Sequence, residues 1–168
     1  LGVLEATGRL ERTLVVFSAD HGETLNDGAD GGFGHGDTLR PEQVGVPLAL
    51  LVPGVPGRRV QCVASNGSVW PSLAPALGLA DPGTWSYPSL VERCPGIAVS
   101  SRWYRRDALA ALSATDGTAT VEHLCGLDGE AFVRRGFDLV ADPGQLSPVS
   151  LASLPTGEVL VAELDQAL

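Results

Sequence analysis

The stretch that decides the fold lies near the amino end and reads Thr13-Leu14-Val15-Val16-Phe17-Ser18-Ala19-Asp20-His21-Gly22-Glu23. Its first five residues are β-branched or apolar, and polar and apolar positions do not alternate among them. Such a run predicts a short strand buried on both faces, as in a parallel sheet flanked by helices. The polar residues that follow would then lie at the carboxyl edge of the sheet, where open α/β sheets bind ligands.

The segments around this strand predict an α/β arrangement. Residues 1–12 place apolar side chains at helical spacing, and residues 68–78 begin with a serine and end at a glycine, as helices do. Residues 46–53 form a second apolar run and residues 59–64 alternate, so both predict strands. Helices and buried strands in succession predict part of a mixed, mostly parallel sheet that is flanked by helices.

The second half of the chain has a different texture. Residues 97–104, 118–125 and 130–140 are short, partly alternating segments, which predict a small antiparallel sheet. Residues 149–168 predict a terminal helix that Pro155-Thr156-Gly157 interrupts.

This change of texture predicts two parts. The first, residues 1–80, would be the carboxyl-terminal portion of an α/β domain. The second, residues 81–168, would be a small antiparallel subdomain with a terminal tail.

Composition narrows the classes of partner. The chain has 168 residues, of which 44% are hydrophobic, which is enough for a globular core. Its net charge of -9 disfavours nucleic acid and anionic lipid, and no apolar run reaches the ~20 residues of a membrane span. The chain contains no Met, so we expect it to be a piece of a longer protein or a processed chain. Three widely spaced cysteines predict no disulfide framework and leave the compartment undecided.

The polar, glycine-rich segment after the first strand carries the chemistry. Asp20 and His21 are adjacent, and Gly22 permits a sharp turn, so both side chains could bind one divalent ion. His35 stands between two glycines that let the loop fold back toward the same site. One carboxylate and two imidazoles form a credible but incomplete metal or oxyanion site. A solvated Asp-His turn is the alternative reading of the same pattern.

These residues resemble the sulfatases, a family within the alkaline phosphatase superfamily. Residues 13–23 carry the most specific match. The weaker matches follow in the family's order, at residues 34–36, 46–48, 53–54, 69–79 and 137–145. The resemblance implies an alkaline phosphatase-like fold and cleavage of a small anionic ester.

The resemblance also assigns roles to individual residues. It places Asp20 and His21 at the positions of two metal ligands and His35 at the position of a residue that contacts the sulfate or phosphate oxygens. The cofactor it implies is one divalent ion, Ca, Mn or Zn. An imidazole ligand agrees better with the softer ions. We also expect Glu23 and Thr24 to orient His21.

The departures from the family are equally informative. The nucleophile, which in sulfatases is a modified Cys or Ser in C/S-x-P-x-R, has no match before Asp20, and Cys94-Pro95-Gly96 lacks the spacing and the Arg. No catalytic nucleophile is therefore expected in this chain. The resemblance implies the carboxyl-terminal part of a sulfatase-type domain with half of the metal site. The missing amino-terminal part would be its partner.

Three functions remain open. The first is a metal-dependent sulfatase-like hydrolase. The second is a phosphoryl or phosphoethanolamine transferase, or a phosphodiesterase, on the same scaffold, since fold alone does not separate these chemistries. The third is a non-catalytic remnant or interaction subunit. The resemblance implies export in bacteria only as a family tendency.

Overall fold

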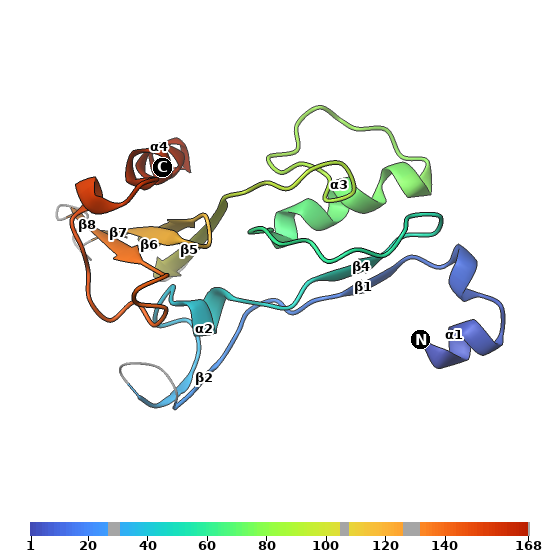
Figure 1. Ribbon diagram of the computed structural model, residues 1–168, viewed down its shortest axis with the longest axis horizontal. Coiled ribbons are helices and arrows are strands. Elements are labelled where there is room, and N and C mark those ends of the chain that lie inside the picture. Colours follow the sequence, from blue (N-terminus) through green and yellow to red (C-terminus); the bar gives the residue numbers. More distant parts are fainter. Residues whose placement is uncertain (27–30, 105–107, 126–131, 168) are drawn as a thin grey trace. The chain divides into compact units, whose positions relative to one another are not determined.

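The computed structural model describes residues 1–26, 31–104, 108–125 and 132–167. The chain divides into two compact units, of which the first comprises Leu1–Ala19 and Pro47–Gly96 and the second comprises Asp20–Val46 and Ile97–Leu168. Figure 1 labels the main elements of both units.

The first unit contains a two-stranded ribbon and a series of short helices. Its elements are α1 (Gly2–Ala6), η1 (Leu10–Arg12), β1 (Val15–Phe17), β4 (Ala49–Leu51), η2 (Asn66–Ser68), α3 (Val69–Leu73) and η3 (Pro75–Leu77). The strands β1 and β4 pair antiparallel, with Val16 opposite Leu50. The parallel neighbours expected for β1 are not among the strands that the structure describes.

Three of the expected segments of this unit differ from the prediction. Residues 1–12 form two short helices instead of one, because Gly8 adopts a left-handed conformation with φ of +63°. The expectation that the first strand is buried on both faces is wrong within this chain, because Val16 is 41% exposed and Phe17 is 64% exposed. Residues 59–64 form no strand. Arg58, which directly precedes this segment, donates hydrogen bonds to the carbonyl oxygens of Leu90 and Val91.

The helix expected over residues 68–78 is confirmed as a succession of helical turns. It begins after Ser65, whose hydroxyl accepts a hydrogen bond from the backbone N–H of Gly67. It ends at Gly78, whose φ of +71° stops the helix in the left-handed region. The stop at Gly78 is as predicted, whereas the serine expected to start the helix, Ser68, makes no capping hydrogen bond with its side chain and Ser65 caps the first turn instead.

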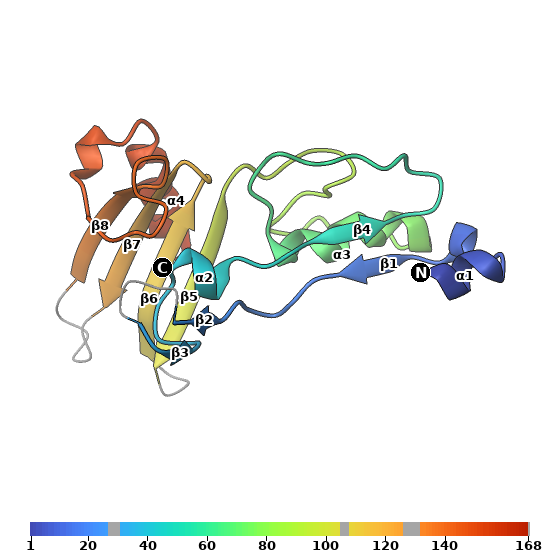
Figure 2. The same cartoon turned by 60° about the horizontal axis from the view of Figure 1, so that its bottom comes forward.

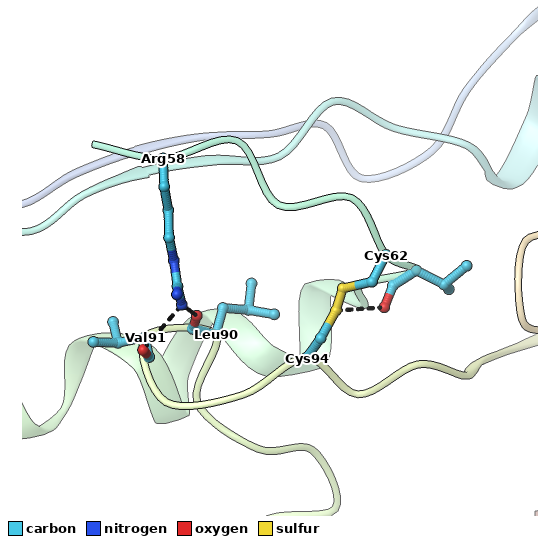
Figure 3. Close-up of a disulfide and its surroundings, with 6 residues drawn as sticks. Arg58, Cys62, Leu90, Val91 and Cys94 are labelled. Atoms are coloured by element: carbon cyan, nitrogen blue, oxygen red, sulfur yellow. Dashed lines mark hydrogen bonds between the residues drawn. A yellow bond between two sulfur atoms is a disulfide. The ribbon is translucent and has the colours of Figure 1, made fainter. Parts of the chain in front are cut away.

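A disulfide joins Cys62 to Cys94 in this unit (Figure 3). The prediction of no disulfide framework is therefore wrong for this pair. Their separation of 32 residues carries no recognisable spacing, and the first unit's fold alone brings their Cα atoms to 6.4 Å.

The second unit is built around an antiparallel sheet in the order β5-β6-β7-β8. Its strands are β5 (Ala98–Tyr104), β6 (Ala108–Thr115), β7 (Ala119–Cys125) and β8 (Phe132–Asp138). The unit also contains β2 (Thr24–Leu25), β3 (Phe33–Gly34), α2 (Pro41–Val44), η4 (Leu151–Ser153) and α4 (Gly157–Ala167). The small antiparallel sheet predicted for the second half is thus confirmed.

The two faces of this sheet differ in polarity. The helix α4 lies on one face of the sheet (Figure 2). There Leu160 and Leu164 belong to the same buried apolar cluster as Leu112 and Ala114 of β6. These helix residues are four apart and the strand residues two apart, so each set lies on one face of its element. The other face is more polar and includes Ser113, which pairs with Ser100 and with Glu122 in the neighbouring strands.

None of the described helices has both the length and the apolar character needed to cross a membrane.

Candidate functional site

The segment that carries the predicted site residues packs its backbone on α2. The N–H of Gly22 donates to the carbonyl oxygen of Gln43 at 2.8 Å. A Cβ on Gly22 would clash with the carbonyl oxygen of Glu42. Glycine is therefore required for close approach here, and this contact positions His21 and Glu23 on either side of it.

The buried side chain of Gln43 forms hydrogen bonds with both ends of the loop over residues 24–38. Gln43 donates from Nε2 to Oγ1 of Thr24 at 2.9 Å. Its Oε1 accepts from the backbone N–H groups of Asp37 and Thr38, each at 3.2 Å. Gln43 and Thr24 are each only 8% exposed. Because a buried amide left unpaired is costly, this network holds the loop in one arrangement.

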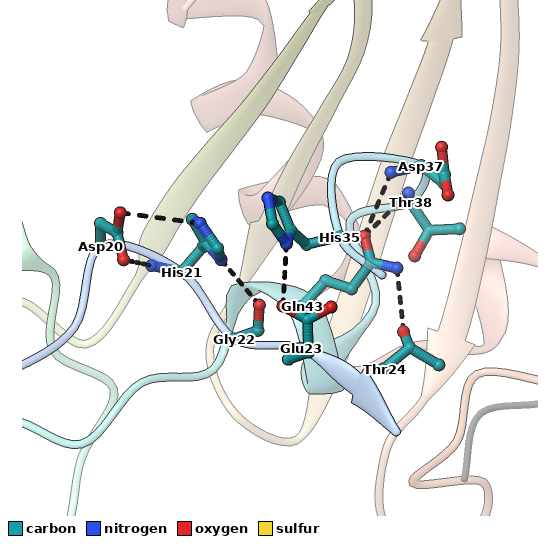
Figure 4. A network of polar contacts seen from close by, with 9 residues as sticks. All are labelled: Asp20, His21, Gly22, Glu23, Thr24, His35, Asp37, Thr38 and Gln43. Atoms are coloured by element: carbon teal, nitrogen blue, oxygen red, sulfur yellow. Dashed lines mark hydrogen bonds and ion pairs between the residues drawn. The ribbon is translucent and has the colours of Figure 1, made fainter. Parts of the chain in front are cut away.

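The two loop histidines lie face to face. Their ring centroids are 3.9 Å apart and their planes are inclined by 29°, so His21 and His35 are stacked (Figure 4). Nδ1 of His21 lies 2.8 Å from the carbonyl oxygen of Gly22. Since a carbonyl only accepts, Nδ1 carries the proton and Nε2 holds the lone pair in the neutral ring.

A carboxylate fixes the second imidazole in the same way. Nδ1 of His35 lies 2.8 Å from Oε2 of Glu23 and donates to it. This leaves Nε2 of His35 for a ligand. A carboxylate on the far nitrogen is a common device for orienting a histidine at a metal or anion site.

Asp20 lies beside His21 and is strongly exposed. Its Oδ1 accepts the backbone N–H of His21 at 3.0 Å, and its Oδ2 is 3.6 Å from Nε2 of the same residue. The backbone hydrogen bond from His21 is the main cause that lowers the pKa of the Asp20 carboxyl below its usual value. The carboxylate is therefore ionised at neutral pH, as a cation ligand must be.

One group of side chains among the described residues could bind a metal ion. Nitrogen and oxygen atoms of His21, Glu23 and His35 all lie within 4.8 Å of one another. Two imidazoles and a carboxylate suit Mn or Zn better than an all-oxygen site would. The donor set therefore fits a divalent ion, although Asp20 is not a member of this particular group.

The structure brings the three predicted site residues together, and their roles as metal or anion ligands stay predictions. Asp20, His21 and His35 line one cavity together, as expected. The expectation that Glu23 and Thr24 orient His21 is wrong. Glu23 forms its hydrogen bond with His35, and Thr24 forms its hydrogen bond with Gln43. Sequence reasoning missed Gln43, which no local pattern distinguishes from any other glutamine.

Two curated proteins are similar to the chain in sequence. The low-salt glycan biosynthesis sulfotransferase Agl7 of Haloferax volcanii is 40% identical over 81 residues, which cover 46% of this chain and 20% of Agl7. Arylsulfatase K of Xenopus laevis is 25% identical over 168 residues, which cover 89% of this chain and 30% of that protein. The chain thus spans less than a third of either relative. No protein-family model matches it.

Solved structures show the fold. The PsFucS1 sulfatase of Pseudoalteromonas sp. superposes with a TM-score of 0.64 at 17% identity, covering 99% of this chain and 38% of that one. The chain therefore has a sulfatase fold, and it resembles the carboxyl-terminal part of a sulfatase domain, as its motifs indicated.

Proposed function

We propose that this chain, with its sulfatase fold, is the carboxyl-terminal part of a metal-dependent sulfatase-like hydrolase that cleaves sulfate esters. The observation that carries the proposal is the stacked His21–His35 pair, with Glu23 on one ring and Asp20 beside the other. Stacked surface imidazoles with carboxylate partners repel one another once protonated. An ion bound at the edge of the two rings, near their Nε2 atoms and the carboxylates, would give this arrangement a function.

Asp20 and His21 would hold one divalent ion, and the imidazole favours Mn or Zn over Ca. A divalent ion bound there would lower the pKa of the attacking group and neutralise charge on the ester oxygens. Glu23 lies close enough to contribute a further carboxylate oxygen.

His35 would bind the sulfate oxygens of a small anionic ester. With Nδ1 donating to Glu23, a proton on Nε2 would donate to a sulfate oxygen, and the Glu23 carboxylate would stabilise the charged ring. Gln43 would hold the loop in position when the ester binds, because its side chain forms hydrogen bonds with both ends of the loop.

The nucleophile would come from a part of the protein outside this chain. No C/S-x-P-x-R motif occurs in the sequence. Cys94, which precedes a proline, is bonded to Cys62 and so offers no free thiol. The low coverage of the relatives, 20% and 30%, agrees with a missing amino-terminal part that supplies the reacting group.

The second candidate is other ester chemistry at the same site: transfer of a sulfate, phosphate or phosphoethanolamine group to an alcohol, or cleavage of a phosphodiester by water. It is favoured by the relative that is named a sulfotransferase. Phosphoryl or phosphoethanolamine transfer and phosphodiester cleavage belong to this candidate, because an imidazole at position 21 would serve them equally well. A non-catalytic chain is the remaining alternative.

The test compares the 168-residue chain with the full-length protein that carries it, using 4-nitrophenyl sulfate, 4-nitrophenyl phosphate and a bis-ester of phosphate, each with added Mn, Zn or Ca. We expect no turnover by the chain alone and metal-dependent sulfate release by the full-length protein. Turnover by the chain alone would contradict a missing nucleophile. Release of 4-nitrophenol from a phosphate ester but not from the sulfate ester would select the second candidate, and no turnover of any ester would select the non-catalytic one.

A further inference from the structure

The cavity that holds the candidate site has a second wall. Its volume is about 320 Å³, and the loop residues Asp20, His21 and His35 line one part of it. The strand β5 lines another part with Ser100, Ser101 and Arg102. A cavity of this size falls in the lower range of pockets for whole small molecules. It is therefore large enough to hold the alcohol part of an ester as well as a sulfate group.

The sheet register explains why Arg102 reaches this cavity. Arg102 pairs with Ala111, which is one residue away from the core residue Leu112, so Arg102 and the α4 helix lie on opposite faces of the sheet. The register of β5 against β6 shifts directly after Arg102. Bulges of this kind re-aim side chains and are frequent next to binding sites.

The Arg102 guanidinium has hydrogen-bonding capacity that the described part of the chain does not satisfy. Its Nε is buried and has no hydrogen-bond partner among the described residues. Asp20 is the carboxylate in the described lining, and its Oδ1 already accepts the backbone N–H of His21. A buried guanidinium N–H without a partner is costly, so a ligand that accepts it would be bound strongly.

We propose that Arg102 recognises a second anionic group, a carboxylate or a further sulfate, on the alcohol part of the sulfate ester. This inference rests on the proposed function, because it assumes that the first sulfate lies at His35. An always-protonated, planar guanidinium fork matches either kind of oxyanion. The residue would thus determine specificity, with the ester sulfate bound by the loop and the second anion bound by the sheet.

The experiment titrates the 168-residue chain with three sugars that share one sulfate: glucose 2-sulfate, glucuronic acid 2-sulfate and glucose 2,6-disulfate. Binding is followed by calorimetry and by NMR, with manganese in excess. Arg102→Gln removes the charge, Arg102→Lys keeps the charge without the fork, and the exposed Arg59→Gln is the matched control.

We expect Arg102→Gln to weaken binding of the two doubly charged sugars by about 10- to 100-fold, as for loss of a charge-assisted hydrogen bond. Glucose 2-sulfate should bind as it does to the unmodified chain, Arg102→Lys should fall in between, and Arg59→Gln should change nothing. If Arg102→Gln weakens binding of all three sugars equally, or of none, the proposed role of Arg102 is wrong. Neither outcome would contradict the proposed function. If the folded unmodified chain binds none of the sugars, the sulfate site itself fails and this inference fails with it.

Discussion

In each loop histidine, one ring nitrogen already forms a hydrogen bond within the protein. Nδ1 of His21 donates to the Gly22 carbonyl and Nδ1 of His35 donates to Glu23, so in each ring Nε2 is the atom left for a ligand. The Glu23 carboxylate accepts a hydrogen bond from His35, and it also lies close enough to both imidazoles to share a metal ion with them. At the scale of single residues, the site is therefore two oriented imidazoles rather than an Asp-His pair alone.

This arrangement predicts that His21→Ala lowers the affinity of the chain for Mn or Zn by about 10- to 100-fold or more, because a direct ligand matters at least as much as its supporting partner. Calorimetric titration with each metal measures the effect. The matched control is Asp37→Asn, an exposed acid of the same loop that is outside the metal-binding group. Equal metal affinity for His21→Ala and the unmodified chain would remove His21 from the site.

At the scale of elements, the central strand β7 buries a carboxyl group. Glu122 is 8% exposed, and burial raises the pKa of its side chain, although Arg135 and Arg40 oppose the shift. The folded protein thus keeps the Glu122 proton to a higher pH than the unfolded chain does. Its contribution to the free energy of unfolding is fully present below the unfolded-state pKa and declines as the pH rises through the folded-state pKa.

Glu122→Gln should consequently give a larger free energy of unfolding than the unmodified chain near neutral pH, because the amide never ionises. The difference should vanish below about pH 4, where the unfolded carboxyl is also protonated. Urea unfolding at both pH values measures this. Glu158→Gln, an exposed acid of α4, should give no such gain at neutral pH. A less stable Glu122→Gln at neutral pH would mean that electrostatic attraction to Arg135 and Arg40 outweighs the cost of burying the carboxylate.

At the scale of the whole molecule, the β1–β4 ribbon leaves apolar side chains in solvent. Phe17 is 64% exposed and Val16 is 41% exposed, although they occupy adjacent positions of one strand. A ribbon of two strands has two unpaired edges, and apolar edges favour association. The ribbon is thus one of the exposed apolar surfaces of the first unit at which a second chain could pack.

We expect the 168-residue chain to self-associate as its concentration rises, and Phe17→Ser to reduce that association. Sedimentation velocity at several concentrations measures both. Phe33→Ser makes the same chemical change at an 80% exposed position of β3, whose ribbon with β2 has two paired residue positions against three in the β1–β4 ribbon, and should have a smaller effect. Monomeric behaviour of the unmodified chain at all concentrations would contradict this prediction.

Local chemistry explains which elements were predictable. The apolar runs around Val16 and Leu50, the glycine stop at Gly78 and the alternating strands near the carboxyl end all became the elements expected of them, with shorter bounds. The terminal helix begins at Gly157, two residues after the Pro155 that interrupts the pattern. The strand β6 was missed because its sequence, ALAALSAT, is rich in alanine, which has high helix and low strand propensity. Only pairing with β5 and β7 makes it a strand.

By itself, the sequence determined the sulfatase resemblance, the antiparallel sheet and the three polar residues Asp20, His21 and His35, because these depend on neighbouring residues and short spacings. The tertiary structure alone decided that Glu23 holds His35, that Gln43 ties the loop and that Arg102 shares the cavity. The residues brought together in this way lie up to 82 positions apart in the sequence, from Asp20 to Arg102 in one cavity lining. No local pattern encodes such distances, since they follow from how the loop packs beside the polar face of the sheet.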